Sequence, residues 1–402
     1  MHESNRRQFL AAATLAGTAG LLSRNGFAAE STDDPVAPWS KGVKISPVSK
    51  VENRHSMHTY YLLNPESPDG RRVVFFASTD KAAHVGNVVV LDRATGKETT
   101  LAEDVHTEDA HRVALQQWTL GGKAVAFHEV VDKRWRVVVV DVETGAKKIV
   151  AEDRQLAFGR GDGHTLPLYG CHWNPGEYRD LYLYDVAKGE LNTSCKITDV
   201  EKKYGDWLST LFMGKPTSIA FPTISPDHKR AFFKMAAGNG GDVYMSKGAS
   251  QRQGIVFYDL VKNEITGMRE KWGHPAWHPD SYHWIEMGNI LFDADMRAAM
   301  IRIPNVPSLR GQHPSVSPNG KIFVQDGLTE SLGGPVGEWA VMIADLRGNR
   351  HEIVHKFVGN RGARSWRVSH AHPAFSADGN RIYFNVNAGE FTQLFVAELP
   401  TG

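Results

Sequence analysis

Short apolar runs rich in Val, Ile, Leu and Tyr recur along the chain, and most end in Asp before a turn. Strong copies occupy residues 88–92, 137–141, 181–185, 255–259 and 340–345, and weaker copies occupy residues 290–293 and 394–397. Turns of the Pro-Asp-Gly type stand at residues 68–70, 226–228, 279–281, 318–320 and 377–379. Short runs of this composition between turns predict strands, and no long segment has a convincing 3.6-residue apolar period.

The runs amount to about seven repeats of roughly forty to sixty residues, a period typical of propeller blades. We therefore predict an all-β fold, a single seven-bladed β-propeller. A two-domain β-sandwich is the alternative, but it does not explain seven similar units. We expect residues 60–63 to form an early strand that helps the last strand, near Leu394, to close the ring. Residues 202–213 are expected to be an irregular insertion between blades.

The N-terminus has the features of a targeting segment. Arg6 and Arg7 precede Phe9 and Leu10, and an apolar stretch of residues 11–22 follows. This looks like a twin-arginine export signal, and the stretch is too short to span a bilayer. An amphipathic first helix is the alternative, although the stretch lacks a polar stripe. The predicted organisation is an export signal at residues 1–29, a linker at 30–45 and the propeller domain at 46–402.

Export places the mature protein in the periplasm or outside the cell, without stable membrane insertion. The formal net charge is +1 and no long run of like charges occurs, so nucleic acid is not an expected partner. Cys171 and Cys195 are compatible with one disulfide in an oxidising compartment, although sequence does not show whether they meet. Oligomeric state is not readable from the sequence.

Histidines recur at one place in the repeat. Three predicted blades open with His-Pro, at His274, His313 and His372, and His370 stands two residues before the last of these. In a strand, residues i and i+2 point to the same side, so His370 and His372 are expected to present two imidazoles to one place. A single channel-lining histidine is more often structural. Three in register, one of them doubled, indicate a shared functional site at the channel mouth.

The histidine pattern suits metal chemistry. Imidazoles bind Mn, Fe, Zn or Ni, and geometry rather than sequence decides among these ions. Three ligands, His313, His370 and His372, would hold a divalent ion with open positions, as in catalytic sites. His274 would then be free to act as a base.

At these residues the chain resembles the oligogalacturonate lyases, seven-bladed propeller enzymes of a polysaccharide lyase family. The resemblance is carried by residues 273–280, by His313 with the strand at 324–327, and by residues 367–373. It implies metal-assisted β-elimination on uronate-containing oligosaccharides such as those of pectin. It makes His274 the base and manganese the first expected ion, with Zn, Fe, Ni or Ca as alternatives. The family's catalytic arginine falls at Arg252, where it would pair with a substrate carboxylate.

One departure from the family pattern is at position 367, where the family has a glutamine ligand and this chain has Arg367. A guanidinium carries a permanent charge and does not coordinate metals. Either three histidines and water hold the ion, or Arg367 binds the substrate carboxylate and the metal is weakened or lost.

Two other functions remain open at this point. A glycoside hydrolase acting on uronides would need paired carboxylates, for which Asp326 and Glu330 are candidates, although both suit turn positions equally well. An exported propeller could also bind a glycan without catalysis.

Overall fold

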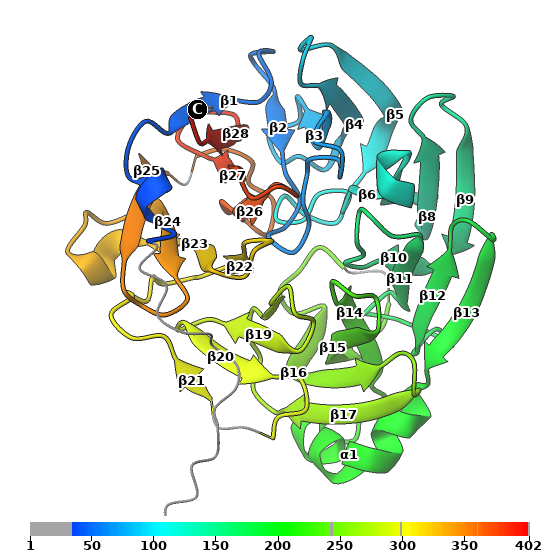
Figure 1. The fold of residues 1–402 in the computed structure, drawn as a ribbon. Coiled ribbons are helices and arrows are strands. Elements are labelled where there is room, and N and C mark those ends of the chain that lie inside the picture. Colours follow the sequence, from blue (N-terminus) through cyan, green and yellow to red (C-terminus); the bar gives the residue numbers. More distant parts are fainter. Residues whose placement is uncertain (1–33, 242–243, 298–299, 360, 401–402) are drawn as a thin grey trace, which may run out of the picture. The chain divides into compact units, whose positions relative to one another are not determined.

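Seven antiparallel four-stranded sheets follow one another along the described part of the chain and form the blades of a ring (Figure 1). The computed structural model describes residues 34–241, 244–297, 300–359 and 361–400. Residues 35–402 form one compact unit, and the predicted export signal lies outside the described residues. The predicted seven-bladed β-propeller is confirmed.

The first four blades run from residue 55 to residue 269. They comprise β2 (His55–Met57), β3 (Arg72–Ser78), β4 (Val85–Asp92) and β5 (Glu98–His106); β6 (Gln117–Thr119), β7 (Ala124–Val131), β8 (Arg134–Asp141) and β9 (Lys147–Glu152); β10 (Arg154–Leu156), β11 (Thr165–Gly170), β12 (Leu181–Asp185) and β13 (Glu190–Cys195); and β14 (Ser218–Ile224), β15 (Arg230–Gly238), β16 (Ser250–Asp259) and β17 (Glu264–Arg269).

The last three blades complete the ring with strands from both ends of the chain. They comprise β18 (Ala276–Trp277), β19 (His283–Glu286), β20 (Ile290–Asp293) and β21 (Ile301–Arg302); β22 (Ser315–Val316), β23 (Ile322–Leu328), β24 (Glu338–Asp345) and β25 (His351–Val358); and β26 (Ala374–Phe375), β27 (Arg381–Val386), β28 (Gln393–Glu398) and β1 (Lys44–Pro47). Single-turn 3-10 helices are η1 (Ala37–Trp39), η2 (Leu120–Gly122) and η3 (Thr329–Leu332).

Every apolar run found in the sequence falls in the third strand of a blade. The third strand of blade one, β4, shows why. Val88 and Val90 are buried in the core shared with blade two, whereas Val89 and Leu91 are buried in the core shared with blade seven. Because both faces of a blade pack on neighbouring blades, this strand is apolar without alternation.

The turns between first and second strands share a local hydrogen-bond pattern. The hydroxyls of Ser67, Ser225, Ser317 and Ser376 each donate to the Asp or Asn side chain two residues later. Each serine oxygen also accepts from the backbone N–H five residues later. A short polar side chain that satisfies its own turn explains why these turns of the Pro-Asp-Gly type, each preceded by serine, recur at this point of the blades.

The ring is closed by β1, which pairs antiparallel with β28 from Lys44 opposite Glu398 to Pro47 opposite Phe395. The expected closing strand at residues 60–63 is therefore wrong; that segment is a turn. Trp39, within the predicted linker, is buried against blades six and seven.

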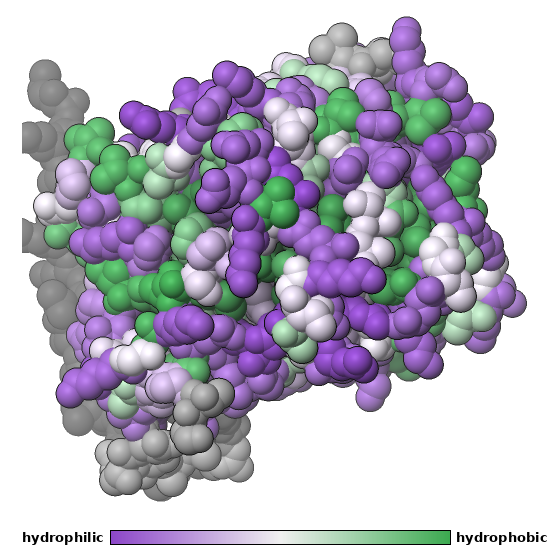
Figure 2. All heavy atoms as spheres, turned by 90° about the horizontal axis from the view of Figure 1, so that it is seen from above, coloured by the Kyte–Doolittle hydropathy of each residue, from purple (hydrophilic) through white to green (hydrophobic). Residues whose placement is uncertain are grey.

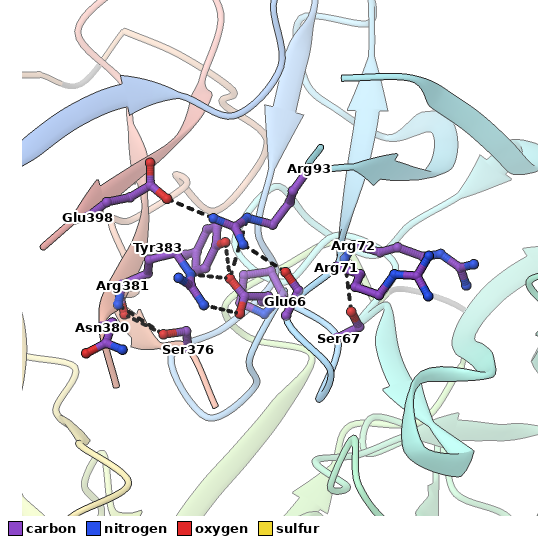
Figure 3. A network of polar contacts seen from close by, with 12 residues as sticks. Glu66, Ser67, Arg71, Arg72, Arg93, Ser376, Asn380, Arg381, Tyr383 and Glu398 are labelled. Atoms are coloured by element: carbon purple, nitrogen blue, oxygen red, sulfur yellow. Dashed lines mark hydrogen bonds and ion pairs between the residues drawn. The ribbon is translucent and has the colours of Figure 1, made fainter. Parts of the chain in front are cut away.

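A buried carboxylate ties blade one to blade seven beside this closure (Figure 3). Glu66 is completely buried and accepts hydrogen bonds from Arg381 Nε at 2.7 Å and Nη2 at 3.0 Å, and from the Tyr383 hydroxyl. Arg93 lies 3.8 Å from the same carboxylate and 2.8 Å from Glu398. A buried charge requires such pairing, so Glu66 links the first blade to the last.

The expected irregular insertion at residues 202–213 is also wrong. It belongs to α1 (Ile197–Phe212), which lies at the rim of the ring beside β17 (Figure 1). Val200, Leu208 and Phe212 are buried against blades three and four, while the intervening residues are mainly polar. Apolar residues at 197, 200, 204, 207–208 and 211–212 do follow a helical period, so the expectation that no long segment has such a period is wrong at this helix.

The remaining surface is mainly polar on the side drawn in Figure 2, with small scattered apolar patches. Among the described residues, no helix is long and apolar enough to cross a membrane. Cys171 and Cys195 are both buried free thiols, so the disulfide left open by the sequence is not formed.

Candidate metal centre and substrate pocket

The histidines predicted to share a site do converge at the channel. They lie just before the innermost strands β18, β22 and β26. Ring centroids are 4.4 Å apart for His274 and His313, 4.5 Å for His313 and His372, and 5.2 Å for His313 and His370. Equivalent positions in consecutive blades therefore meet on one side of the ring.

His370 and His372 reach the site for a different reason from the one expected. They do not lie on a strand, because β26 begins at Ala374. His372 has φ 48°, a left-handed conformation that is uncommon for a residue with a side chain. An irregular, strained segment, rather than strand alternation, brings both rings to the cluster.

A fourth histidine joins the cluster that the sequence did not reveal. His111 lies between β5 and β6, with its ring 4.5 Å from His372 and 4.7 Å from His370. The ligand nitrogens of His111, His313, His370 and His372 all lie within 4.8 Å of one another. Like the other histidines, His111 precedes an innermost strand, and this position could have identified it in the sequence. It was not recognised because no proline follows it and because it stands further from its strand.

These four side chains fit a divalent metal ion. Nδ1 of His313 is 2.8 Å from Asp326 and Nδ1 of His111 is 3.1 Å from the Val368 carbonyl, which directs Nε2 of each into the cluster. Both Nε2 atoms, Nδ1 of His370 and both nitrogens of His372 are buried without a hydrogen-bond partner among the described residues. Several unpaired imidazole nitrogens facing one another are costly unless an ion satisfies them.

Burial keeps the rings of His111, His370 and His372 neutral, the form in which imidazole binds metals. It lowers the pKa of His370 to about 3. Burial, with Arg367 and the other histidines of the cluster nearby, holds the pKa of His111 well below the usual value. Burial, with the neighbouring histidines, does the same for the pKa of His372. Neutral rings retain the lone pair that coordination requires.

Asp326, on β23, supports the cluster from behind. Its Oδ1 accepts from the His313 backbone N–H at 2.9 Å and faces His313 Nδ1, and its Oδ2 accepts from the His372 backbone N–H at 2.9 Å. Both oxygens are therefore engaged in orienting two histidines. The carboxyl of Glu330 accepts from the Gly337 N–H. Because both oxygens of Asp326 are engaged with the histidines, Asp326 is poorly placed to serve as one of a hydrolase's two carboxylates.

His274 stands beside the four-histidine cluster rather than in it. Its Nδ1 lies 2.9 Å from the Gln312 carbonyl, and its backbone N–H donates to Glu286 at 2.7 Å. Burial, with His313 and Lys234 nearby, holds the pKa of His274 well below its usual value. The ring is therefore neutral and able to accept a proton.

Four cationic side chains line a pocket next to these histidines: Arg112, Lys234, Arg252 and Arg367. Arg112 pairs with buried Glu108 at 2.7 Å, and Arg367 lies 3.6 Å from Asp109. The predicted substrate-binding residues Arg252 and Arg367 are thus brought together.

Arg252 has no carboxylate within ion-pair distance among the described residues; its guanidinium lies 5.6 Å from the Phe221 ring. Burial, reinforced by the charges of Arg367 and Arg112, lowers the pKa of Arg252 to about 10. An anionic ligand would relieve this crowding of positive charge.

Two tyrosines that the sequence placed on a strand form a wall of this pocket. The Tyr60 ring lies 4.6 Å from His372 and stacks on Phe158 at 5.1 Å. Tyr61 lies 5.2 Å from His313, and its hydroxyl donates to the Pro275 carbonyl at 3.2 Å. Burial raises the pKa of both phenols, so they remain neutral and line the channel beside the histidines.

Comparison with known proteins gives similarity at the level of structure. No protein-family model and no curated sequence matches the chain. An oligogalacturonate lyase in complex with manganese superposes with a TM-score of 0.60 and 16% identity, covering 90% of this chain and 94% of that one. An oligogalacturonate lyase from Vibrio parahaemolyticus gives 0.59 and 14%, covering 90% and 95%.

Other propellers are also similar. A prolyl endopeptidase structure gives a TM-score of 0.50 at 13% identity, covering 87% of this chain and 51% of that one. The resemblance expected from the sequence is confirmed in the fold, and chemistry must be argued from the site itself.

Proposed function

We propose that this protein is a metal-dependent lyase that cleaves uronate-containing oligosaccharides by β-elimination. The observation that carries the proposal is the cluster of His111, His313, His370 and His372 beside a pocket lined by four cations. A metal cluster alone suits many reactions, and a cationic pocket alone suits many anions. Together they suit a carboxylated sugar whose reaction requires carboxylate charge to be neutralised. The fold similarity to two oligogalacturonate lyases supports the same conclusion.

The four histidines would hold the ion. When bound, a divalent ion supplies Lewis acidity that stabilises negative charge developing on a uronate carboxylate. Manganese is the first choice, since a structure of similar fold is a manganese complex, and Zn, Fe or Ni also suit imidazole donors. Calcium is disfavoured by an all-nitrogen ligand set, because Ca²⁺ prefers oxygen. His111 supplies the fourth ligand, so Arg367 is free to face the substrate.

The protein's own residues account for the remaining chemistry. Arg252 and Arg367 would pair with substrate carboxylates through the guanidinium fork. Neutral His274 would take the proton from C5, a role worth on the order of 10²–10⁴ in rate. The electron pair of the C5–H bond first passes into an enolate of the carboxylate and then forms the C4=C5 double bond as the C4–O bond breaks. The products are an unsaturated uronate and a shortened oligosaccharide.

The test is incubation of the metal-loaded protein with oligogalacturonides and other oligouronides, following absorbance of the unsaturated product. His274→Ala is expected to lose turnover while elemental analysis finds the metal content unchanged. His355→Ala is the matched control, because His355 lies on β25 against Phe357 and Phe384, away from the cluster, and should retain turnover. Absence of the chromophore with every oligouronide, with Mn, Zn, Fe and Ni each supplied, would refute the proposal.

Two outcomes would point to the other functions. New reducing ends without the chromophore would indicate a hydrolase. Saturable oligouronide binding with no product of either kind would indicate a binding protein. Export to the periplasm or beyond is part of the proposal, and sequencing the N-terminus of the protein recovered from the periplasmic and extracellular fractions tests removal of residues 1–29.

A further inference from the structure

Lys234 is a charged group of the pocket that the proposed chemistry has not yet used. It lies on β15 and lines the pocket with Arg252 and Arg367. Its Nζ is 4.1 Å from the centroid of the Trp272 ring. Among the described residues it has neither a hydrogen bond nor an ion pair. A lysine left without a carboxylate in a largely buried pocket is unfavourable for the fold, which points to a role in function.

Glu286 is the acidic residue whose charge acts most on Lys234, and its carboxylate already has other hydrogen-bond partners. Glu286 accepts from Arg269 Nη1 at 2.8 Å and from the backbone N–H groups of His274 and Met287. The charge of Glu286 raises the pKa of Lys234, whereas the positive charges of Arg252, Arg367 and Arg112 lower it. The positive charge is therefore only partly compensated.

The consequence is a lysine that can exchange its proton at neutral pH. Burial lowers the pKa of Lys234 to about 7; the charge of Glu286 opposes this, and the nearby arginines reinforce it. A group whose pKa lies near the working pH is well suited to proton transfer in either direction. The arginines of the pocket stay charged and serve better to bind carboxylates.

β-Elimination requires a second proton transfer besides the one at C5. The departing glycosidic oxygen is a poor leaving group unless it gains a proton as the C4–O bond breaks. Neutral His274 carries a single ring N–H, and its Nδ1 faces the Gln312 carbonyl, so it has no acidic proton to give before it has acted as the base. Tyr61 donates its hydroxyl hydrogen to the Pro275 carbonyl. Lys234 carries an available proton in the same pocket, and both Lys234 and His274 contact Trp272.

We propose that Lys234 is the catalytic acid that protonates the leaving oxygen. This rests on the lyase function proposed above. His274 takes the proton from C5, the double bond forms between C4 and C5, the C4–O bond breaks, and Lys234 Nζ–H gives its proton to the departing oxygen. Lys234 ends neutral and His274 ends protonated, and exchange of protons with water restores both. Two groups with pKa values set apart by their surroundings divide the acid and base roles.

Lys234→Met and Lys234→Arg separate this role from binding. Both are expected to lose on the order of 10²–10⁴ in kcat/KM for the chromophore assay. Arginine keeps the positive charge but does not release a proton at neutral pH, so substrate should still bind. Lys356→Met, on β25 in a surface pair with Glu338, is the matched control and should cleave at the wild-type rate.

Hydrogen exchange at C5 separates the acid from the base. In D2O, both Lys234 variants should still incorporate deuterium at C5 of unreacted substrate, measured by NMR, because His274 still removes that proton. His274→Ala should show neither exchange nor cleavage. If the Lys234 variants lose exchange in parallel with cleavage, or cleave normally, Lys234 is not the acid. If the wild type neither exchanges nor cleaves any oligouronide, the lyase function itself fails.

A titration independent of activity uses the neighbouring indole. Loss of the ammonium charge 4.1 Å from Trp272 should change indole fluorescence with a midpoint near pH 7. The transition should be absent from Lys234→Met and from Trp272→Phe. A transition in wild type that persists in Lys234→Met would show that another group titrates, and would overturn the assignment of the proton to Lys234.

Discussion

The carboxylate behind the histidine cluster offers a direct test of how the metal centre is built. Asp326 is fully buried and its two oxygens hold the backbone of His313 and His372 and the His313 ring. Asp326→Asn keeps the size of the side chain. It removes the charge, and it places an amide N–H₂ where one oxygen had accepted, most simply opposite the His372 N–H.

The expected loss follows from these contacts. One backbone donor of the pair becomes unsatisfied, which costs about 1–3 kcal/mol of folding stability. The His313 ring loses the negative partner that orients it and makes Nε2 more basic. Removing such a partner typically weakens metal binding by about 10–100-fold, equivalent to roughly 1.4–2.7 kcal/mol.

The measurement is the dissociation constant for Mn²⁺ and Zn²⁺ by competition with a chelating dye, alongside thermal unfolding of the metal-free protein. Asp345→Asn is the matched control. Asp345 is buried on β24 of the same blade, where its carboxylate pairs with Arg347 at 3.0 Å. This control should lower the melting temperature without changing metal affinity. A folded Asp326→Asn protein that binds both ions within about twofold of wild type would refute the reasoning.

Three further changes have distinct expected results. Glu66→Ala removes a buried carboxylate and leaves the buried Tyr383 hydroxyl without its acceptor, whereas Arg381 and Arg93 are partly exposed and keep Asp378 and Glu398 as partners. The change should cost about 1–3 kcal/mol in urea unfolding. Glu143→Ala, at a largely exposed ion pair, should cost under about 1 kcal/mol, and equal losses would contradict the role given to the buried network. His111→Ala should weaken metal binding while leaving the fold intact, and unchanged affinity would exclude it as a ligand. The pKa of Lys234 is about 7 in the folded protein and 10.5 in the unfolded chain. Between these pH values the unfolded state binds more protons than the folded state. The free energy of unfolding therefore rises with pH across this range. Lys234→Met should therefore melt higher than wild type near pH 7, with the difference shrinking toward pH 10; a constant difference would contradict the shift.

The blades could be predicted from the sequence because the third strand of each blade is a continuous apolar run. Val88 to Leu91 are apolar on both faces, since each face packs on a neighbouring blade. The innermost strands of blades five to seven carry almost no such pattern, because β18, β22 and β26 have two residues each and show no periodicity. The number of blades was thus predictable, whereas the exact course of the channel wall was not.

The same distinction applies to the site. His274, His313 and His372 were recognisable because three blades repeat one local sequence in register. His111, Tyr60 and Tyr61 come from irregular segments whose positions depend on distant contacts, such as the stacking of Tyr60 on Phe158. The departure at Arg367 became interpretable only when a histidine from blade two was found in the cluster.

The pairing of β1 with β28 has a consequence for the order of biosynthesis. β1 is synthesised first but can pair only after β28, the last strand, has been made. Because this pairing spans almost the whole chain, we expect the ring to close late and slowly. Histidines from blade two and from blades six and seven meet only in the finished ring, so a nascent chain lacks the four-histidine cluster. A protein carried folded across a membrane, as the predicted twin-arginine signal implies, would therefore take its ion from the compartment where it was synthesised.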